Sequence, residues 1–395
     1  MRRVLFVGYP VHVHAVREIV NAHSDAWRIV AAGMSLGSRN VALAKLPFVD
    51  AVVALGGPGP DALIAAVARR MQIPIAVIWA GSDAATLKSD AAARIRARRY
   101  RHAACASAIR EELQRLGIVA DEIPIVAADV ATPPPSLPER FSVLAYVPQG
   151  GDDLYGLNVI LEAAERLPFV RFDVVGGAEC SRTVKPNVTF YRWEKHVTRR
   201  LDDATVLLRP TKHDGLSRMV VEALARGRHV IWSQKMQGVS YAASPQECIR
   251  QLSMLYGKHE RKELDINHEG LTCVRDYFSP SKIARGLERF FDDVARRPTA
   301  KRNRAVVSGD SRRVAEFIAA IGPNMPEWDF HPAMSGSKSE RLEDVLSLIA
   351  AKAWYRLGDD DPFLRYVGTV LRKPSVRVRI DEASVTRTVR AVMQT

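Results

Sequence analysis

The sequence predicts an α/β protein of three successive units, in which parallel β-strands alternate with helices. Short, nearly continuous apolar runs are separated by amphipathic helical patterns from the first residues onward, as in doubly wound domains. A proline-rich segment at 131–140 divides this alternation into two series. A weak internal repeat then relates residues 300–395 to the first series. These observations predict two Rossmann-like domains followed by a third, divergent unit.

Residues 1–130 are predicted to form the first domain. The spacing of a helix is clear in DALIAAVARRM (61–71), where Asp61 is placed to cap the first turn. The apolar runs lack the alternation of a half-exposed sheet, so they are expected to be strands buried on both faces. These runs are RVLFVG (3–8), WRIVAAG (27–33), DAVVALG (50–56) and IPIAVIW (73–79).

Residues 131–140, ATPPPSLPER, are predicted to be a linker, because a segment so rich in proline cannot lie inside a helix or a central strand. A second α/β series begins at FSVLAYV (141–147). It ends in helical patterns that stop at ARRP, which places the second domain at 141–299.

Residues 300–395 are predicted to be a divergent copy of the first domain. RAVVSG (304–309) lies 301 positions after RVLFVG, and Trp328 follows Trp27 at the same offset. The offset stays nearly constant farther along, although the two copies share few identities. We expect this unit to contribute a surface for docking or for a homo-oligomer, because the site motif described below has no copy in it.

The composition excludes several classes of protein. Hydrophobic residues make up 47 % of the chain, which is enough for sizeable cores. No stretch approaches the ~20 apolar residues that span a bilayer, and the apolar run at the amino terminus is too short for a signal peptide. The four cysteines are scattered, which argues against a zinc site or a disulfide framework. We therefore expect a cytoplasmic protein.

The net charge of +13 favours anionic partners without choosing among them. A cluster of basic residues has two interpretations: a solvated helix face, or a surface (Arg94–Arg101) that meets anionic lipid at the inner face of the cell membrane. Only Tyr100 places an aromatic ring within it, so nucleic acid is not an expected partner. The cluster comprises Lys88, Arg94, Arg96, Arg98, Arg99 and Arg101.

Residues 212–233, KHDGLSRMVVEALARGRHVIWS, combine an expected anion site with an acid inside an apolar run. The residues Gly215, Leu216 and Ser217 open a helix, whose free N–H groups and positive dipole end attract anions. Glu222 lies farther along this helix, and a buried carboxylate without a partner is costly. Its expected partner is a ligand diol. The alternative is that Glu222 lies on an exposed stripe of the helix.

Three segments of the second domain resemble the donor-binding domain of family 4 glycosyltransferases. They are GLNVILEAAERLPFVRFDVVGG, NVTFYRW and LDDATVLLRPTKHDGLSRMVVEALARGRHVIWS. The most specific part is Asp214, seven residues, then Glu222 and Ala223, followed by Gly227 and a strand; the family has Glu at the first acid. Two Rossmann-like domains joined by a proline-rich segment also form the outline of the GT-B fold.

The resemblance implies an enzyme that transfers a sugar from a nucleotide-sugar donor to a hydroxyl group, with retention of configuration and without a metal or cofactor. The acceptor would be a glycan, a lipid-linked sugar or a polysaccharide precursor. It also implies that Asp214 and the loop 213–217 face the donor sugar and diphosphate, and that Glu222 accepts hydrogen bonds from the ribose hydroxyls. Tyr191 and Trp193 of NVTFYRW are the remaining donor-binding candidates.

The chain departs from the family where the family carries an Arg and a Lys for the donor diphosphate. The segment VPQGGDDLYGLN has two acids, and Tyr155 stands where the Lys would be. Cleavage of a sugar–diphosphate bond requires positive charge or hydrogen-bond donors near the leaving group. The candidates are Arg209, Lys212 and Arg218, each of which is alternatively a solvated surface charge. The departure also favours a second hypothesis, a non-catalytic protein that binds a nucleotide or glycan or acts as a scaffold.

The first domain is expected to bind the acceptor. His12 and His14 follow the first strand at its carboxyl end, where open α/β sheets bind ligands, and either could orient an acceptor hydroxyl. The alternative is a pair of loop histidines without a role. Asp83 ends WAGSD (79–83) and either contacts the substrate or caps the helix that follows. The segment GGPGP (56–60) lacks the order of a dinucleotide-binding loop.

Overall fold

The computed structural model describes residues 1–32, 36–57, 59–90, 94, 97–177, 185–192 and 197–296, and the backbone of four strands between 303 and 377. Contacts within the chain divide it into two compact units. Unit 1 comprises Met1–Glu122 and Glu288–Thr395, and unit 2 comprises Ile123–Leu287. No helix of the described ranges is long and apolar enough to cross a membrane.

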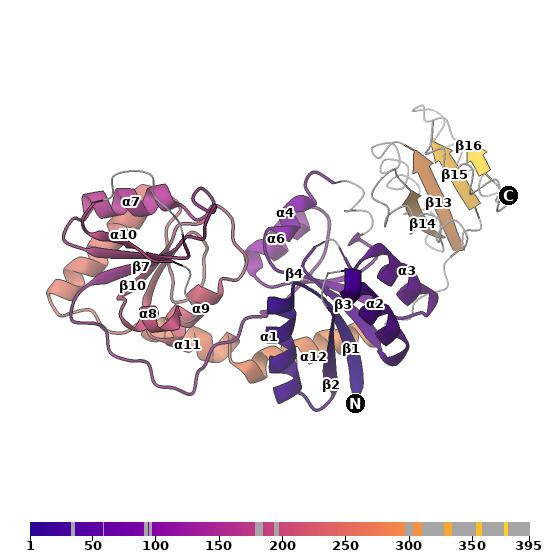
Figure 1. Ribbon diagram of the computed structural model, residues 1–395, viewed down its shortest axis with the longest axis horizontal. Helices are drawn as coiled ribbons and strands as arrows, with labels where there is room; N and C mark the ends of the chain where they lie inside the picture. Colours follow the sequence, from indigo (N-terminus) through magenta and orange to yellow (C-terminus); the bar gives the residue numbers. More distant parts are fainter. Residues whose placement is uncertain are drawn as a thin grey trace. The chain divides into compact units, whose positions relative to one another are not determined.

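Unit 1 contains a parallel sheet with the strand order β2-β1-β3-β4-β5-β6 (Figure 1). The four runs predicted as strands form β1 to β4. The inner residues of β1, β3 and β4 are almost completely buried because helices cover both faces, whereas β2 lies at the edge of the sheet and is partly exposed. The strands are β1 (Arg2–Gly8), β2 (Trp27–Ala32), β3 (Ala51–Leu55), β4 (Ile75–Trp79), β5 (Arg101–Ala104) and β6 (Asp121–Glu122).

The helices of unit 1 pack on opposite faces of this sheet. Helices α2 and α3 bury Ala42 and Ile64 against Leu5, Val52 and their neighbours on one face. The next residue of β1, Phe6, points the other way, toward helix α12 (Pro280–Arg296). The helices are α1 (Pro10–His23), α2 (Leu36–Lys45), the short 3₁₀ helix η1 (Leu46–Phe48), α3 (Ala62–Arg70), α4 (Asp83–Thr86) and α6 (Ser107–Arg115).

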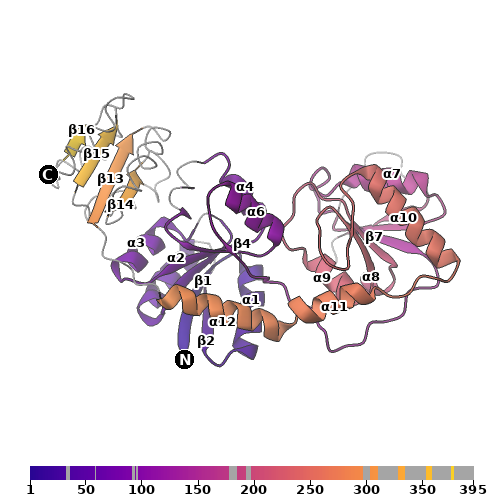
Figure 2. The same ribbon diagram turned by 180° about the vertical axis from the view of Figure 1, so that it is seen from behind.

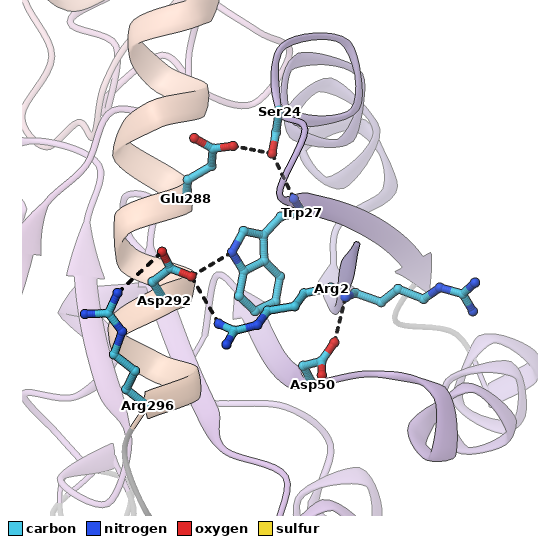
Figure 3. A network of polar contacts seen from close by, with 8 residues as sticks. Arg2, Ser24, Trp27, Asp50, Glu288, Asp292 and Arg296 are labelled. Atoms are coloured by element: carbon cyan, nitrogen blue, oxygen red, sulfur yellow. Dashed lines mark hydrogen bonds and ion pairs between the residues drawn. The ribbon is translucent and has the colours of Figure 1, made fainter.

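The last turns of α12 (Pro280–Arg296) are fixed to the start of the chain by polar contacts (Figure 3). The carboxylate of Asp292 accepts hydrogen bonds from the indole N–H of Trp27 at 3.1 Å and from the Arg2 guanidinium at 3.2 Å. One turn earlier, Glu288 bonds the hydroxyl of Ser24. Because residues 288–296 are held in this way, this part of α12 belongs to unit 1, although the sequence placed all of 141–299 in the second domain.

Unit 2 contains a second parallel sheet, with the order β12-β11-β10-β7-β8-β9. Strand β7 lies in the middle, and the chain extends the sheet first to one side of it and then to the other. The strands are β7 (Ser142–Tyr146), β8 (Arg171–Val175), β9 (Val188–Phe190), β10 (Val206–Arg209), β11 (His229–Trp232) and β12 (Ser240–Tyr241).

Helices also cover both faces of the sheet in unit 2. Helices α7 and α10 lie on one face, and α8, α9 and α11 lie on the other, as both views show (Figures 1 and 2). The first face forms a continuous core from Val143 and Phe172 to Ile160 and Leu252. The helices are α7 (Leu157–Arg166), α8 (Thr198–Asp202), α9 (Arg218–Ala225), α10 (Pro245–Glu260) and α11 (His268–Tyr277).

The proline-rich segment packs within unit 2. The guanidinium of Arg228 is fully buried and donates hydrogen bonds to the carbonyls of Pro135 at 2.9 Å and Ser136 at 3.0 Å. Farther upstream, the N–H of Ala128 bonds the carbonyl of Phe278. The boundary between the units therefore falls at 122/123, before the segment 131–140 that the sequence suggested as a linker.

The strands of the C-terminal region form a third parallel sheet that repeats the first. Its order is β14-β13-β15-β16, which corresponds to β2-β1-β3-β4. The register repeats too: Asn303 pairs with Trp328 as Arg2 pairs with Trp27. This agrees with the predicted fold class. The strands are β13 (Asn303–Gly309), β14 (Trp328–Ala333), β15 (Ala353–Leu357) and β16 (Ser375–Arg377).

Candidate functional site

The strand order of unit 2 reverses between β7 and β10, so the loops that follow these two strands diverge to opposite faces. Such a switch point opens a crevice at the carboxyl edge of a parallel sheet, where α/β proteins bind ligands. The two loops are joined here. The backbone N–H of Lys212 bonds the carbonyl of Leu154 at 2.9 Å. Gly156 has a φ of +68°, and a Cβ there would lie 2.3 Å from the carbonyl oxygen of Pro210, so only glycine fits.

Arg209 is the last residue of β10 and lies at this switch point. It is only 7 % exposed, and its Nε donates to Oδ2 of Asp214 at 2.6 Å. The guanidinium lies over the ring of Tyr155, 5.1 Å from its centre. Tyr155 in turn contacts Tyr146, the last residue of β7, edge to face at 5.6 Å between ring centres. A buried cation therefore lies beside the residue that replaces the lysine of the resembled family.

Helix α9 starts directly after the loop that carries Asp214. Ser217 is its N-cap, and the Ser217 hydroxyl accepts a hydrogen bond from the N–H of Val220. Gly215 and Leu216 lead into this cap, and the carbonyl of Asp214 is held by the side-chain amide of Gln234 at 2.5 Å. The loop is thus fixed at both ends. The predicted helix start is present, with its amino end toward the switch point, and its role as an anion site stays a prediction.

Glu222 lies in the middle of α9, and the residues on either side of it in the helix are buried. Its side chain is 21 % exposed, and burial raises the pKa of its carboxyl group, partly offset by Arg218 and Arg226. The nearest cation is the Arg218 guanidinium at 4.0 Å. Among the residues that the structure describes, none donates a hydrogen bond to this carboxylate. A largely buried acid with open acceptor sites is suited to bind hydroxyl groups of a ligand.

The other two cationic candidates are exposed. The ammonium of Lys212 pairs with Asp153, and these side chains are 62 % and 83 % exposed. The side chain of Arg218 is 54 % exposed, with Glu222 as its ion-pair partner. Of the three cations considered from the sequence, Arg209 is therefore the one that is buried at the switch point.

Tyr191 follows β9, which stands last in the strand order, two strands from β7. Its hydroxyl accepts a hydrogen bond from Arg171 at 3.3 Å, and the Arg200 guanidinium covers its ring at 3.6 Å. These contacts occupy both the hydroxyl and one face of the ring. Trp193, the other aromatic candidate, lies outside the described residues.

His12 and His14 lie in the first turns of α1 rather than in a loop. Pro10 starts this helix immediately after the strand, because its fixed φ and missing N–H suit the first helical position. Both histidines are exposed near the carboxyl end of β1. Their position next to the carboxyl end of β1 agrees with the sequence interpretation. The expectation that they lie in a loop is wrong, because both belong to α1.

Asp83 joins the loops that follow β3 and β4. Its carboxylate accepts hydrogen bonds from the N–H groups of Gly81 at 2.6 Å, Gly57 at 3.1 Å and Ala80 at 3.2 Å. Burial nevertheless raises its pKa above the ordinary value, because desolvation outweighs these donors. Asp83 thus links the loops at this edge of the sheet through backbone hydrogen bonds. It is the first residue of α4, and Ser82 occupies the N-cap position.

The basic cluster makes internal contacts over much of its length. Lys88 pairs with the buried Glu112 at 2.7 Å, and Arg94 donates to the carbonyls of Leu87 and Lys88. Arg101 binds both Asp121 and Asp293. Arg96 lies outside the described residues. These cations stabilise unit 1, so less of their charge faces outward than the sequence alone indicated.

Sequence reasoning did not identify Tyr146 and Gln234 as parts of this site. Tyr146 ends a buried strand at the switch point, and a polar tip at the carboxyl end of an apolar strand is the signal that could have found it. Gln234 carried no such signal, because its contact with Asp214 depends on how the strands are ordered.

No family model and no curated protein matches the chain. Solved structures with the same fold do exist. HepE of Anabaena, solved in complex with UDP and glucose, superposes with a TM-score of 0.57 at 12 % identity over 74 % of this chain and 100 % of that one. Sucrose-phosphate synthase from Thermosynechococcus elongatus gives 0.57 at 11 %, over 74 % and 99 % of the two chains. The lipopolysaccharide outer core galactosyltransferase WaaB gives 0.54 at 12 %, also over 74 % and 99 %. At these identities the similarity shows the fold, and the predicted GT-B class is confirmed.

Proposed function

We propose that the protein is a glycosyltransferase that binds a nucleotide sugar in unit 2 and transfers the sugar to a hydroxyl group. The observation that carries this proposal is Glu222, a largely buried carboxylate without a hydrogen-bond donor among the described residues, on the helix that starts at the switch point. The fold supports it as well, because the proteins of similar structure include HepE, which was solved with UDP-glucose, and the galactosyltransferase WaaB.

The ribose and the diphosphate of a nucleoside diphosphate match the two parts of this site, which are Glu222 and the start of α9. Ribose hydroxyls donate hydrogen bonds, and a carboxylate such as that of Glu222 is a strong acceptor for them. The free N–H groups at the start of α9 attract the diphosphate. The Asp214-x7-Glu222 spacing further supports a family 4-like enzyme that retains configuration and needs no metal, which would act by positioning and by stabilising the departing diphosphate.

Unit 1 would bind the acceptor, a glycan or lipid-linked sugar. His12 and His14 are exposed near the carboxyl end of β1, where an acceptor hydroxyl could be oriented by an imidazole. Asp83 would act through the two loops that it joins, since its oxygens already accept several backbone hydrogen bonds. The C-terminal unit would contribute a docking or oligomerisation surface.

A non-catalytic nucleotide-binding protein is the second candidate, favoured by Tyr155 and by the exposed Lys212–Asp153 pair in place of a free lysine. The two candidates differ in turnover. A transferase releases a nucleoside diphosphate from at least one member of a panel of nucleotide sugars when an acceptor is added. A binding protein is stabilised by the same panel without releasing product.

Glu222→Ala is expected to weaken nucleoside diphosphate binding by ~1.5–3 kcal/mol, the usual worth of hydrogen bonds to a charged group. UDP, ADP and GDP are titrated calorimetrically into the parent and the variant. Glu165→Ala, which removes an exposed glutamate from another helix of unit 2, serves as the control and should bind as the parent does. Unchanged affinity in Glu222→Ala would return this residue to a structural role.

The affinity for nucleoside diphosphates should also depend on pH through Glu222. Only the ionised carboxylate accepts two hydroxyl donors, and burial raises the pKa of Glu222, so binding weakens at a higher pH than an ordinary glutamate would cause. The difference in affinity between the parent and Glu222→Gln should shrink as the pH falls through this raised pKa. Titration of the ligand itself cancels in that comparison. Parallel affinity profiles for the two proteins would contradict the assignment.

A further inference from the structure

Arg209 is a largely buried cation whose terminal nitrogens remain available to a ligand. A guanidinium has five N–H donors, and donors that make no bond within the protein are free to bind water or a ligand. Arg209 is only 7 % exposed, yet the hydrogen bond that it makes within the described part of the chain is the one from Nε to Asp214. Its two terminal nitrogens, Nη1 and Nη2, have no acceptor among those residues and are not fully enclosed, so a ligand can reach them.

The surroundings hold this cation in place while its terminal nitrogens stay without an acceptor among the described residues. The ring of Tyr155 supports the guanidinium at 5.1 Å through a cation–π contact, which leaves the terminal donors open. Tyr146 supports Tyr155 from the side. Asp214 fixes Nε at 2.6 Å, so the side chain is bound along one edge and one face. The remaining edge, with Nη1 and Nη2, is the part left for a ligand.

The location of Arg209 indicates what kind of ligand this is. It ends β10 at the switch point, and the loop of Asp214 leads from it directly into the N-cap of α9. A guanidinium with two open donors matches a phosphate group, which it can bind in a bidentate manner. All three cations are paired with an acid, but Lys212 and Arg218 are exposed to solvent, whereas Arg209 is held in a buried position.

We propose that Arg209 is the residue that binds the diphosphate of the donor and stabilises it as leaving group, with Tyr155 and Asp214 as positioning residues. This proposal rests on the proposed function. The bond between the anomeric carbon and the diphosphate oxygen breaks, and its electron pair stays on that oxygen beside Arg209. The acceptor oxygen bonds to the anomeric carbon, and its proton leaves to the diphosphate or to solvent. Tyr155 therefore does not mark a lost cation, since the charge is supplied from β10.

Asp214 has a different role in this arrangement from the one that the family resemblance implied. Its carboxylate is occupied by Arg209 rather than open toward a sugar. The side chain is one methylene shorter than the glutamate of the family, and it contacts the last residue of the strand that precedes its loop. Asp214 would thus determine where the guanidinium points, and it would affect donor binding through Arg209.

The test compares nucleoside diphosphates with the corresponding nucleosides, using UDP and uridine, ADP and adenosine, and GDP and guanosine. Arg209→Gln removes the charge, and we expect at least a ~10-fold loss of diphosphate affinity, from the worth of charge-assisted hydrogen bonds. The nucleoside affinity should stay unchanged, because Glu222 is intact. The double variant Arg209→Gln/Asp214→Asn keeps the local charge balanced. Its diphosphate affinity should fall by the same factor as that of Arg209→Gln, again with unchanged nucleoside affinity. Calorimetry serves for the diphosphates and NMR titration for the weaker nucleosides.

Tyr155 supplies a second test that changes no charge and does not depend on the folding of the Arg209 variants. Tyr155→Phe keeps the aromatic face and should bind diphosphates as the parent does. Tyr155→Leu removes it and should weaken diphosphate binding ~2- to 30-fold, from the range of cation–π contacts. Phe169→Leu, which removes an exposed aromatic ring elsewhere in unit 2, is the control and should have no effect.

The outcomes separate this proposal from the proposed function. An equal diphosphate-to-nucleoside affinity ratio in the parent and in Arg209→Gln, or identical binding by Tyr155→Leu and Tyr155→Phe, would overturn the role of Arg209 while leaving nucleotide binding in place. A parent protein that binds none of the six ligands would overturn the proposed function, and with it this inference.

Discussion

Replacement of Phe291 by alanine is expected to lower the free energy of unfolding of unit 1 by about 3–5 kcal/mol, the usual range for a fully buried phenylalanine. The Phe291 ring has no exposed surface. It packs edge to face against Phe6 at 5.7 Å and against Trp27 at 5.5 Å, and both of these rings are themselves fully buried. The truncation therefore leaves a cavity that neighbouring side chains cannot readily fill.

Urea unfolding followed by tryptophan fluorescence measures this effect, because Trp27 lies against the altered side chain. Arg296→Ala is the control on the same helix. It removes an exposed ion pair with Asp292 and should change stability by no more than ~1 kcal/mol. Similar unfolding midpoints for the two variants would show that α12 does not stabilise unit 1 through this face. The contact matters for function as well, since β1, which carries Phe6, leads directly to His12 and His14.

The strands of the two six-stranded sheets could be predicted because strands buried on two faces appear in the sequence as continuous apolar runs. The sequence was less informative about which sheet each helix packs against. The amphipathic pattern of α12 shows that one side is buried, but it does not show which sheet covers that side. The hydrogen bond from Trp27 to Asp292 shows that the last turns of α12 pack in unit 1. These residues lie 265 positions apart, so the contact leaves no local signal in the sequence.

The C-terminal repeat was visible in the sequence because strand pairing preserves register. A shift by one residue would exchange the two faces of a strand, so insertions between copies accumulate in loops. The pairs confirm this: Ala305 lies opposite Ala353 as Val4 lies opposite Ala51, with offsets of 301 and 302. Similarity outside the strands is too low for the sequence to predict any contact of this unit.

The candidate site was predictable where it depends on local pattern and unpredictable where it depends on strand order. Glu222 stood out as an acid inside an apolar run, and its burial follows from its neighbours in the helix. The relation between Arg209 and Tyr155 could not be predicted. These residues are far apart in the chain, and they meet because β10 pairs with β7.

A buried histidine in unit 1 gives the second large effect. His102 in β5 accepts a hydrogen bond at Nδ1 from the indole N–H of Trp79 at 3.1 Å, and its Nε2 lies 2.8 Å from the carbonyl of Ala97. Nδ1 must therefore be unprotonated, and Nε2 carries the hydrogen. Burial lowers the pKa of His102 to about 4, and the neighbouring Arg101 contributes to this shift. Protonation of Nδ1 would place a second donor against the indole N–H and leave both without an acceptor.

Unit 1 is consequently expected to lose about 3 kcal/mol of stability between pH 6.5 and pH 4 through His102 alone, because its pKa falls from the ordinary 6.5 to about 4 on folding. The direction follows from proton uptake. As the pH falls below 6.5, the unfolded chain protonates His102 whereas the folded protein does not, so unfolding is favoured until the pH reaches the folded pKa; below about 4 the contribution stays constant. Urea unfolding across this range is compared with that of His102→Gln, which does not titrate. The stability advantage of the parent over the variant should shrink steadily with falling pH, and a constant difference from pH 7 to pH 4 would show that His102 is not held in its neutral form.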